Sequence, residues 1–178
     1  IPEEGIKQFT GSARKNVLQQ YHLLLLSRYL VGVLNEAGIK AVVLKGVAAG
    51  SFYPIPELRK SGDIDLLLLN PKQESAMKEV LIANNLWVKE EQLALHHVTF
   101  ETRSGIEIEV HTLLAEPFDN RNMNVYLDKL LSEQRCEYEE RDVMGVKLPV
   151  LSKAFFAYEL LLHMLQHFVY AGFGLKLL

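Results

Sequence analysis

Hydrophobic positions recur along the chain with two different periods, one typical of helices and one typical of strands. Between Ala13 and Ala37 they recur every three or four residues, which predicts an amphipathic helix, and Gly38 supplies its C-terminal stop. A second long helical pattern runs from Ser152 to about Tyr170. Shorter helices are predicted over Val47 to Ser51, Pro71 to about Asn85, and Val125 to Leu131.

Strand patterns lie between these helices. Lys40 to Leu44 and Ile64 to Leu69 are almost continuously apolar, which is typical of strands covered on both faces. Ala94 to Thr102 and Ile106 to His111 flank a short turn and predict a hairpin, and a second hairpin is predicted around Met144-Gly145. The pattern therefore favours an α/β (α+β) fold, a mixed sheet flanked by helices.

We expect three parts along the chain. Residues 1–38 form an N-terminal helical segment, residues 39–150 form the core, and residues 151–178 begin a C-terminal helical region. The first residue is not Met, and the last residues stop inside an apolar pattern without a cap. We therefore expect a fragment of a longer protein, with the C-terminal helical part truncated.

Composition narrows the classes of function. The chain has 178 residues, 49% of them hydrophobic, which is enough for one well-buried domain, and its net charge of −3 argues against coating nucleic acid through phosphate contacts alone. Cys136 is the only cysteine, so an intrachain disulfide and a four-cysteine zinc site are excluded. Apolar runs are far shorter than the roughly 20 residues of a membrane span. We expect a cytoplasmic protein that does not enter the membrane.

The strongest chemical signal is a pair of acids in Gly62-Asp63-Ile64-Asp65-Leu66. On a strand, Asp63 and Asp65 point to the same face, because side chains alternate with a period of two. Two carboxylates that close repel each other unless a cation lies between them, and the apolar run after Asp65 predicts a buried carboxylate. A hard divalent ion, Mg²⁺ or Mn²⁺, is the natural partner. Solvated acids at a strand edge are the alternative.

A third acid lies on the later strand. Glu107, Glu109 and His111 share one face of that strand, opposite Ile108 and Val110. If the strand pairs beside the Asp63–Asp65 strand, Glu109 completes a three-carboxylate site able to hold two metal ions. The alternative is that these polar residues simply form the exposed face of the strand, which gives the same alternation.

Two further features carry positive charge or backbone donors. Lys45-Gly46 follows a strand, so the glycine lets backbone N–H groups approach a phosphate while the lysine supplies charge. Arg59 lies four residues before Asp63, within reach of a triphosphate held there. A plain turn and a surface arginine are the alternatives.

The histidines permit other readings. His96, His97 and His111 belong to the two strands of one hairpin, where they could form a transition-metal site with Glu109. His163 and His167 have the spacing of a helical zinc site, but no Glu follows His163. Packing or hydrogen bonding is the favoured role for this second pair.

Four segments together resemble the uncharacterised nucleotidyltransferase family of the polymerase-beta-like nucleotidyltransferase superfamily, from about Arg14 to the helix that carries His163. These segments are Leu44-Lys45-Gly46, Arg59, Gly62 to Leu67, and Ile108-Glu109-Val110-His111. The chain departs from the superfamily pattern at Lys45, which replaces a small residue, and in the long interval from Gly46 to Asp63.

The resemblance implies a polymerase-beta-like nucleotidyltransferase fold and a Mg²⁺-dependent transfer of a nucleoside monophosphate from an NTP to an acceptor hydroxyl or phosphate. It implies that three acids hold the metal and perform catalysis, with Glu109 also helping to accept the acceptor's proton. Four other residues would bind the substrate. The acids are Asp63, Asp65 and Glu109, and the substrate-binding residues are Lys45, Gly46, Arg59 and His111.

Two other functions stay open. The altered Lys45-Gly46 turn fits a catalytically impaired nucleotide-binding or regulatory domain of the same fold. A metal-dependent glycosyltransferase also uses an Asp-x-Asp pair, but it predicts the pair in a loop after a strand. The sequence specifies neither the NTP, nor the acceptor, nor the oligomeric state.

Overall fold

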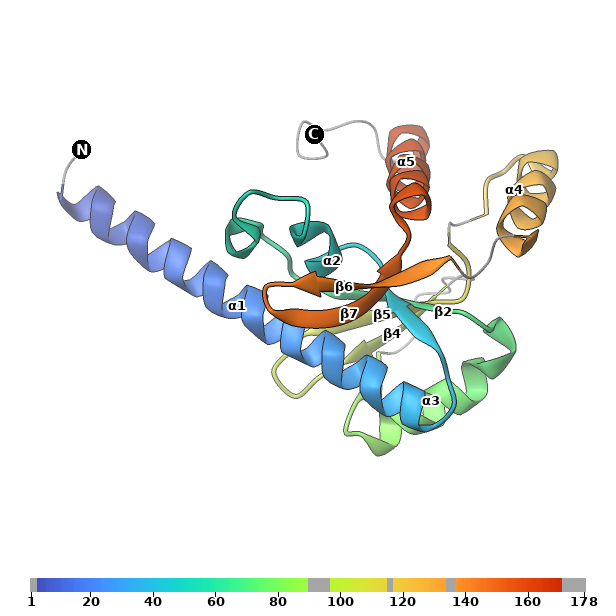
Figure 1. The fold of residues 1–178 in the computed structure, drawn as a ribbon, viewed down its shortest axis with the longest axis horizontal. Helices are drawn as coiled ribbons and strands as arrows, with labels where there is room; N and C mark the ends of the chain where they lie inside the picture. The colour runs from blue at the N-terminus through green and yellow to red at the C-terminus, as the bar shows by residue number, and fades with distance from the viewer. Residues whose placement is uncertain (1–2, 90–96, 115–116, 134–136, 171–178) are drawn as a thin grey trace.

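The computed structural model describes residues 3–89, 97–114, 117–133 and 137–170. Seven strands form one mixed sheet in the order β3-β4-β5-β2-β1-β7-β6 (Figure 1). Pairing is parallel between β2 and β5 and between β1 and β7, and antiparallel elsewhere. The strands are β1 (Ala41–Val43), β2 (Ile64–Leu68), β3 (Trp87–Val88), β4 (His97–Glu101), β5 (Glu107–His111), β6 (Tyr138–Val143) and β7 (Val146–Leu151).

Helices cover both faces of the sheet. Figure 1 shows α1 and α3 on one side of the sheet and α2 and α5 on the other. The helices are α1 (Glu3–Glu36), α2 (Val47–Gly50), α3 (Glu74–Ala83), α4 (Arg121–Glu133) and α5 (Lys153–Tyr170), with short 3-10 turns η1 (Pro56–Leu58) and η2 (Pro71–Gln73). This arrangement confirms the predicted mixed sheet flanked by helices.

The core lies between α1 and the centre of the sheet. Leu23, Leu24, Leu30 and Leu34 of α1 are fully buried, at the helical spacing that the sequence shows. Every residue of β2 is buried, which confirms a strand covered on both faces. Each fully buried leucine stabilises the fold by about 1.5–3 kcal/mol relative to an exposed one.

Most predicted elements are confirmed, and the differences lie at their ends. The first helix begins at Glu3, ten residues before the predicted start, because the polar residues ahead of the periodic pattern continue the same helix. The helix predicted from Pro71 starts as a 3-10 turn and becomes α-helical at Glu74. Residues 94–96 of the predicted hairpin strand lie outside the described residues, and β4 covers the rest to Glu101.

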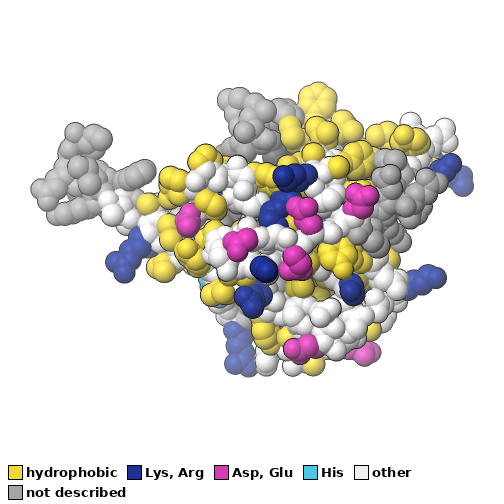
Figure 2. Space-filling model, viewed as in Figure 1, with side chains coloured by type: hydrophobic (Ala, Val, Ile, Leu, Met, Phe, Trp, Pro, Cys, Tyr) yellow, Lys and Arg dark blue, Asp and Glu magenta, His cyan; other side chains and the backbone are white. Residues whose placement is uncertain are grey.

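Charged and hydrophobic side chains lie on different parts of the surface. Acidic and basic side chains are interspersed over the middle of the face in Figure 2, whereas hydrophobic side chains gather near the edge where α5 lies. Leu161, Phe168 and Val169 of α5 are exposed, while Phe155 and Phe156 on its other side are buried. The first turns of α5 therefore fix the helix to the sheet.

Candidate functional site

The pairing of β2 with β5 brings the predicted acids together. Asp65 and Glu109 are register partners across this parallel pair, and His97 is the partner of His111 across β4 and β5. Side chains two residues apart on a strand share a face, so Glu109 and His111 point the same way. The pairing on which the third acid depended is therefore confirmed.

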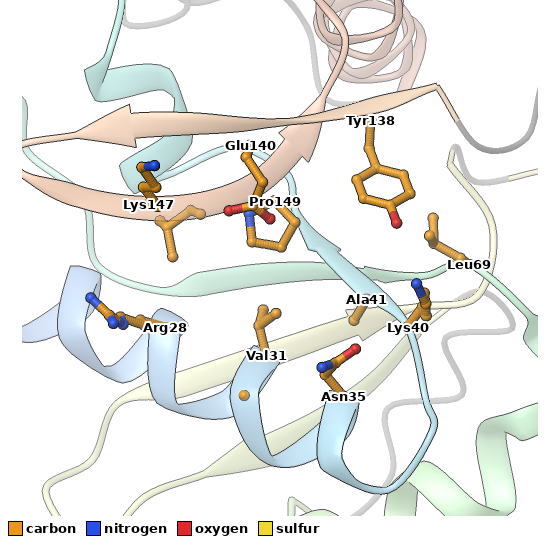
Figure 3. Close-up of a pocket in the computed structure, with 12 residues that line it drawn as sticks. Arg28, Val31, Asn35, Lys40, Ala41, Leu69, Tyr138, Glu140, Lys147 and Pro149 are labelled. Atoms are coloured by element: carbon orange, nitrogen blue, oxygen red, sulfur yellow. The ribbon is translucent and has the colours of Figure 1, made fainter.

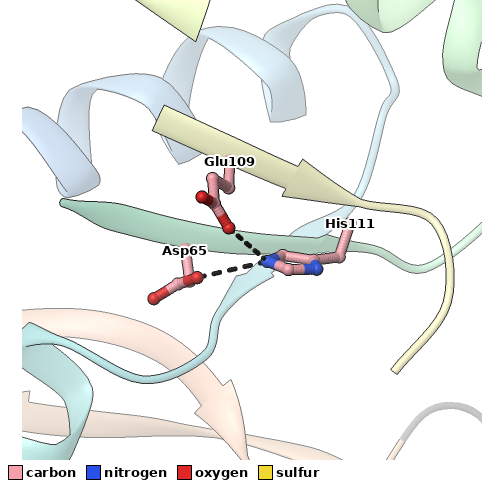
Figure 4. Close-up of side chains that lie close together, drawn as sticks. All are labelled: Asp65, Glu109 and His111. Atoms are coloured by element: carbon pink, nitrogen blue, oxygen red, sulfur yellow. Dashed lines mark hydrogen bonds and ion pairs between the residues drawn. The ribbon is translucent and has the colours of Figure 1, made fainter. Parts of the chain in front are cut away.

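Asp65, Glu109 and His111 form a compact cluster (Figure 4). The Nε2 atom of His111 lies 3.1 Å from Oδ1 of Asp65 and 3.5 Å from Oε2 of Glu109. One ligand atom from each residue lies within 4.8 Å of the other two, which is close enough for all three to hold one metal ion. His111, which the sequence assigned to substrate binding, thus lies among the potential metal ligands.

Burial and opposite charges act against each other in this cluster. Burial raises the pKa of Asp65, but the hydrogen bond with His111 and the charge of Lys45 outweigh it, so this pKa is lowered. A separate hydrogen-bonding interaction between His111 and Glu109 lowers the pKa of Glu109. Burial lowers the pKa of His111, yet its two carboxylate partners raise it overall. The lysine and histidine neighbours of these carboxylates therefore favour their charged form.

Asp63 lies at the open edge of the same site. Its side chain is exposed, and it precedes the first residue of β2. Partial desolvation by the surrounding walls and then the negative charge of Asp65 raise the pKa of Asp63. The carboxylates of Asp63, Asp65 and Glu109 thus act on one another electrostatically, although Asp63 is not part of the compact cluster.

The Lys45-Gly46 turn lies directly against the acids. The Nζ atom of Lys45 is 3.4 Å from Oδ1 of Asp65, so the lysine faces the cluster. Gly46 has a φ of 53°, a conformation that other residues rarely adopt, and a Cβ atom there would lie 3.4 Å from the carbonyl oxygen of Asp63. Glycine therefore permits both the turn and its close approach to the acid strand.

Arg59 holds this turn in place. Its Nη1 atom donates hydrogen bonds to the carbonyl oxygen of Gly46, at 2.9 Å, and to the hydroxyl of Ser61. The guanidinium also lies over the ring of Tyr53, 5.8 Å from its centroid. Arg59 lines the cleft as well, so one side chain connects the turn and the site.

These residues border a cleft of about 440 Å³ whose far wall is α5. Glu159 and Gln166 of that helix are buried polar residues, and both line the cleft. Burial raises the pKa of Glu159 to about 7. Sequence reasoning missed both residues. The available signal was an acid on the buried face of an apolar helix, three residues after the buried Phe156.

The histidines fall into two groups. His97 and His111 lie with ring centroids 5.2 Å apart, whereas His96 lies outside the described residues. His163 and His167 contact each other edge to face, with centroids 4.4 Å apart, and both line the cleft. Desolvation lowers the pKa of His163 to about 4, so its ring is neutral at pH 7.

A second cavity, of about 340 Å³, lies between α1 and the β6–β7 pair (Figure 3). Its rim carries the basic side chains of Arg28, Lys40 and Lys147 and the acid Glu140, all of them exposed. None of its lining residues borders the acidic cleft.

The mixed sheet flanked by helices is the polymerase-beta-like nucleotidyltransferase fold. The chain belongs to the uncharacterised nucleotidyltransferase family, whose sequence model matches residues 1–178. This membership confirms the resemblance, and it assigns the protein to the transferases. Asp65 lies on β2 and Asp63 directly precedes this strand, whereas a glycosyltransferase predicts the pair in a loop after a strand.

The fold also occurs in a solved structure, and a second one is reported for its similarity alone. An antigenic nucleotidyltransferase-like protein from Paracoccidioides brasiliensis matches with a TM-score of 0.51 and 15% identity, over 82% of this chain and 67% of that one. A lincomycin-bound lincosamide antibiotic adenylyltransferase, LnuA, matches with a TM-score of 0.48 and 11% identity, over 73% of this chain and 80% of that one. No curated protein matches the sequence. Among the described residues, no helix is long and apolar enough to span a membrane.

Proposed function

We propose that the protein transfers a nucleoside monophosphate from an NTP to an acceptor hydroxyl or phosphate, with Mg²⁺ or Mn²⁺ as its cofactor. The observation that carries the proposal is the register of β2 and β5, which sets Asp65 beside Glu109 in a cleft that Lys45 also lines. Acids on adjacent strands facing a cation-bearing turn suit a metal-bound triphosphate.

The donor set fits a hard divalent ion. Asp65 and Glu109 offer carboxylate oxygens at the centre, and Asp63 offers a further one at the open edge. Lys45 supplies positive charge to this cluster, and the two carboxylates raise the pKa of His111. When bound, the ion would polarise the α-phosphate and neutralise charge that develops on the phosphate oxygens.

Other side chains have roles that follow from their positions. Lys45 and Arg59 border the cleft and would bind phosphate oxygens, and the backbone at Gly46 can approach a phosphate without a Cβ in the way. In the reaction, an acceptor oxygen forms a bond to the α-phosphorus. The bond from that phosphorus to the bridging oxygen breaks, and pyrophosphate leaves with the electron pair.

The test combines binding and turnover. Isothermal titration with ATP, GTP, CTP and UTP in the presence of Mg²⁺ should detect at least one complex. Asp65→Asn removes a charged ligand with almost no change in volume, so we expect it to keep the fold and to abolish metal-dependent turnover. Glu107→Gln is the matched control, because Glu107 lies on β5 too but is paired with Lys89 outside the cluster. Absence of binding to any NTP, or full activity in Asp65→Asn, would refute the proposal.

One observation favours a second candidate, a nucleotide-binding domain without catalysis. The ammonium of Lys45 lies 3.4 Å from Asp65, where it already supplies part of the charge that a metal would bring. This candidate predicts NTP binding that does not change when EDTA is added, with no release of pyrophosphate. Metal-dependent release would exclude it.

A further inference from the structure

Glu159 is a buried acid that lines the cleft of the proposed reaction, and one of its carboxylate oxygens accepts no hydrogen bond among the described residues. Its side chain is 2% exposed. Oε1 lies 4.0 Å from Nζ of Lys45, whereas Oε2 is buried and has no hydrogen-bond partner among the described residues. A buried acceptor without a partner destabilises the fold, and it does so more when it is charged. Folding alone gives no reason for this acid, whereas a molecule bound in the cleft that Glu159 lines would give it a partner.

The position of Glu159 separates it from the predicted metal ligands. The ligands lie on β2 and β5, whereas Glu159 lies on α5, the far wall of the same cleft. Glu159 contacts Lys45, which stands between the two walls and also contacts Asp65. A molecule held between the walls would therefore meet the acid cluster on one side and Glu159 on the other.

The charges around the cleft restrict what that molecule is. The α5 wall contributes four polar residues and no lysine or arginine, namely Glu159, His163, Gln166 and His167. Among the described lining residues, the lysine and arginine side chains are those of Lys45 and Arg59, and neither belongs to α5. A phosphate on the acceptor would have to enter between Glu159 and the acid cluster, where negative charges repel it.

We propose that Glu159 receives the acceptor: its carboxylate, which lines the cleft, accepts a hydrogen bond from the acceptor's hydroxyl and takes its proton, and the acceptor is a small hydroxyl compound that is uncharged or carries an amine. This inference rests on the proposed nucleotidyl transfer and refines its acceptor to a hydroxyl. The hydroxyl oxygen forms the new bond to the α-phosphorus, pyrophosphate leaves with the electron pair, and the proton passes to the Glu159 carboxylate and then to solvent.

Two physical properties of the site support this role. Burial raises the pKa of Glu159 to about 7, which matches a group that gains and loses a proton near neutral pH. The neutral ring of His163, one helical turn along α5, can form a hydrogen bond with an uncharged molecule in the cleft. An ammonium on the acceptor would in addition be attracted by the carboxylates of the cleft.

The first part of the test measures Glu159→Gln, Glu159→Asp and the control Glu107→Gln. Binding is measured by titrating the wild type and variants with Mg²⁺ and a non-hydrolysable NTP. In a separate assay with the hydrolysable NTP, pyrophosphate release is followed from pH 5 to 9. We expect Glu159→Gln to bind the nucleotide within about twofold of the wild type but to transfer at least ~100-fold more slowly, the usual contribution of a proton acceptor. Glu159→Asp should regain part of the rate, and the rise of the rate near pH 7 should vanish in Glu159→Gln only.

The second part identifies the class of acceptor. The wild type is incubated with NTPs labelled at the α-phosphate, Mg²⁺ and an extract of the source cells divided into three fractions. The fractions are small molecules that pass an anion-exchange resin, small molecules that it retains, and macromolecules. We expect the label in the first fraction. Label in the retained or macromolecular fraction, or in none, overturns the acceptor assignment.

The outcomes separate this inference from the proposed function. If the wild type binds no nucleotide, nucleotidyl transfer itself is refuted, whatever the role of Glu159. Normal metal-dependent transfer with an unchanged rate in Glu159→Gln would leave the transferase intact and overturn the role of Glu159. An equal loss of nucleotide affinity and rate in that variant would also overturn it, because Glu159 would then shape the nucleotide pocket.

Discussion

Replacing Glu159 by Gln should stabilise the protein at alkaline pH and not at acidic pH. Burial raises the pKa of Glu159 from 4.5 to about 7. The folded chain therefore holds this proton more tightly than the unfolded chain does, and the stability from that proton is present below pH 4.5 and lost as the pH rises to 7. At about 1.4 kcal/mol per pKa unit, the loss is about 3 kcal/mol.

The groups around Glu159 determine how much of this loss is seen. Lys45, at 4.0 Å, offsets part of the cost of the charged carboxylate, and the charge of His111 acts in the same direction. Asp65 acts in the opposite direction. All of these influences are contained in the raised pKa, so the figure of about 3 kcal/mol is the net effect of burial and neighbours.

The assay compares thermal unfolding of the wild type and Glu159→Gln at pH 4.5 and pH 8.5. Glutamine does not titrate, so the difference in unfolding free energy between the two proteins should grow by about 3 kcal/mol across this range. For a chain of this length that is a relative rise in Tm of roughly 6–12 °C. Glu79→Gln is the control, because Glu79 is exposed on α3. An equal effect of Glu159→Gln at both pH values would refute the argument that burial of Glu159 costs free energy.

Three further predictions follow from the geometry. Gly46→Ala places a side chain on a residue with a φ of 53°, so it should lower the unfolding free energy by about 1–2 kcal/mol in urea titration and weaken NTP binding in calorimetry. Phe100 is fully buried and is the partner of Ile108 across β4 and β5. Phe100→Ala should therefore lower the unfolding free energy by about 3–5 kcal/mol, also measured in urea. The rate of pyrophosphate release should rise as the pH passes about 7, where Glu159 loses its proton, and a rate that falls there would contradict its role as proton acceptor.

Much of the site was predictable because it depends on local patterns. The alternation along β5 places Glu109 and His111 on one face, as predicted, whereas Asp63 precedes β2 and lies at the open edge of the site. The apolar run after Asp65 predicted its burial correctly, and Asp65 is 5% exposed. The roles of these residues and of Arg59 in catalysis and substrate binding stay predictions that the proposed variants test.

Other features of the site depend on contacts between segments far apart in the chain. Sequence patterns gave no reason to place α5 over the cleft, so Glu159 and Gln166 were missed, and His163 was expected to serve packing or hydrogen bonding. The direct contact of Lys45 with Asp65 was likewise not predicted, since the lysine was expected to bind phosphate. Such contacts follow from how helices and strands pack, which hydrophobic periodicity does not specify.

The sequence by itself determined the elements, the faces on which the acids lie, and the family, because side-chain alternation and apolar periodicity are properties of a few consecutive residues. Only the tertiary structure decided that β2 pairs with β5 in the register that joins Asp65 to Glu109, and that α5 closes the cleft with Glu159. Strand order and helix docking are set by burial of the whole apolar surface at once, so no single segment encodes them.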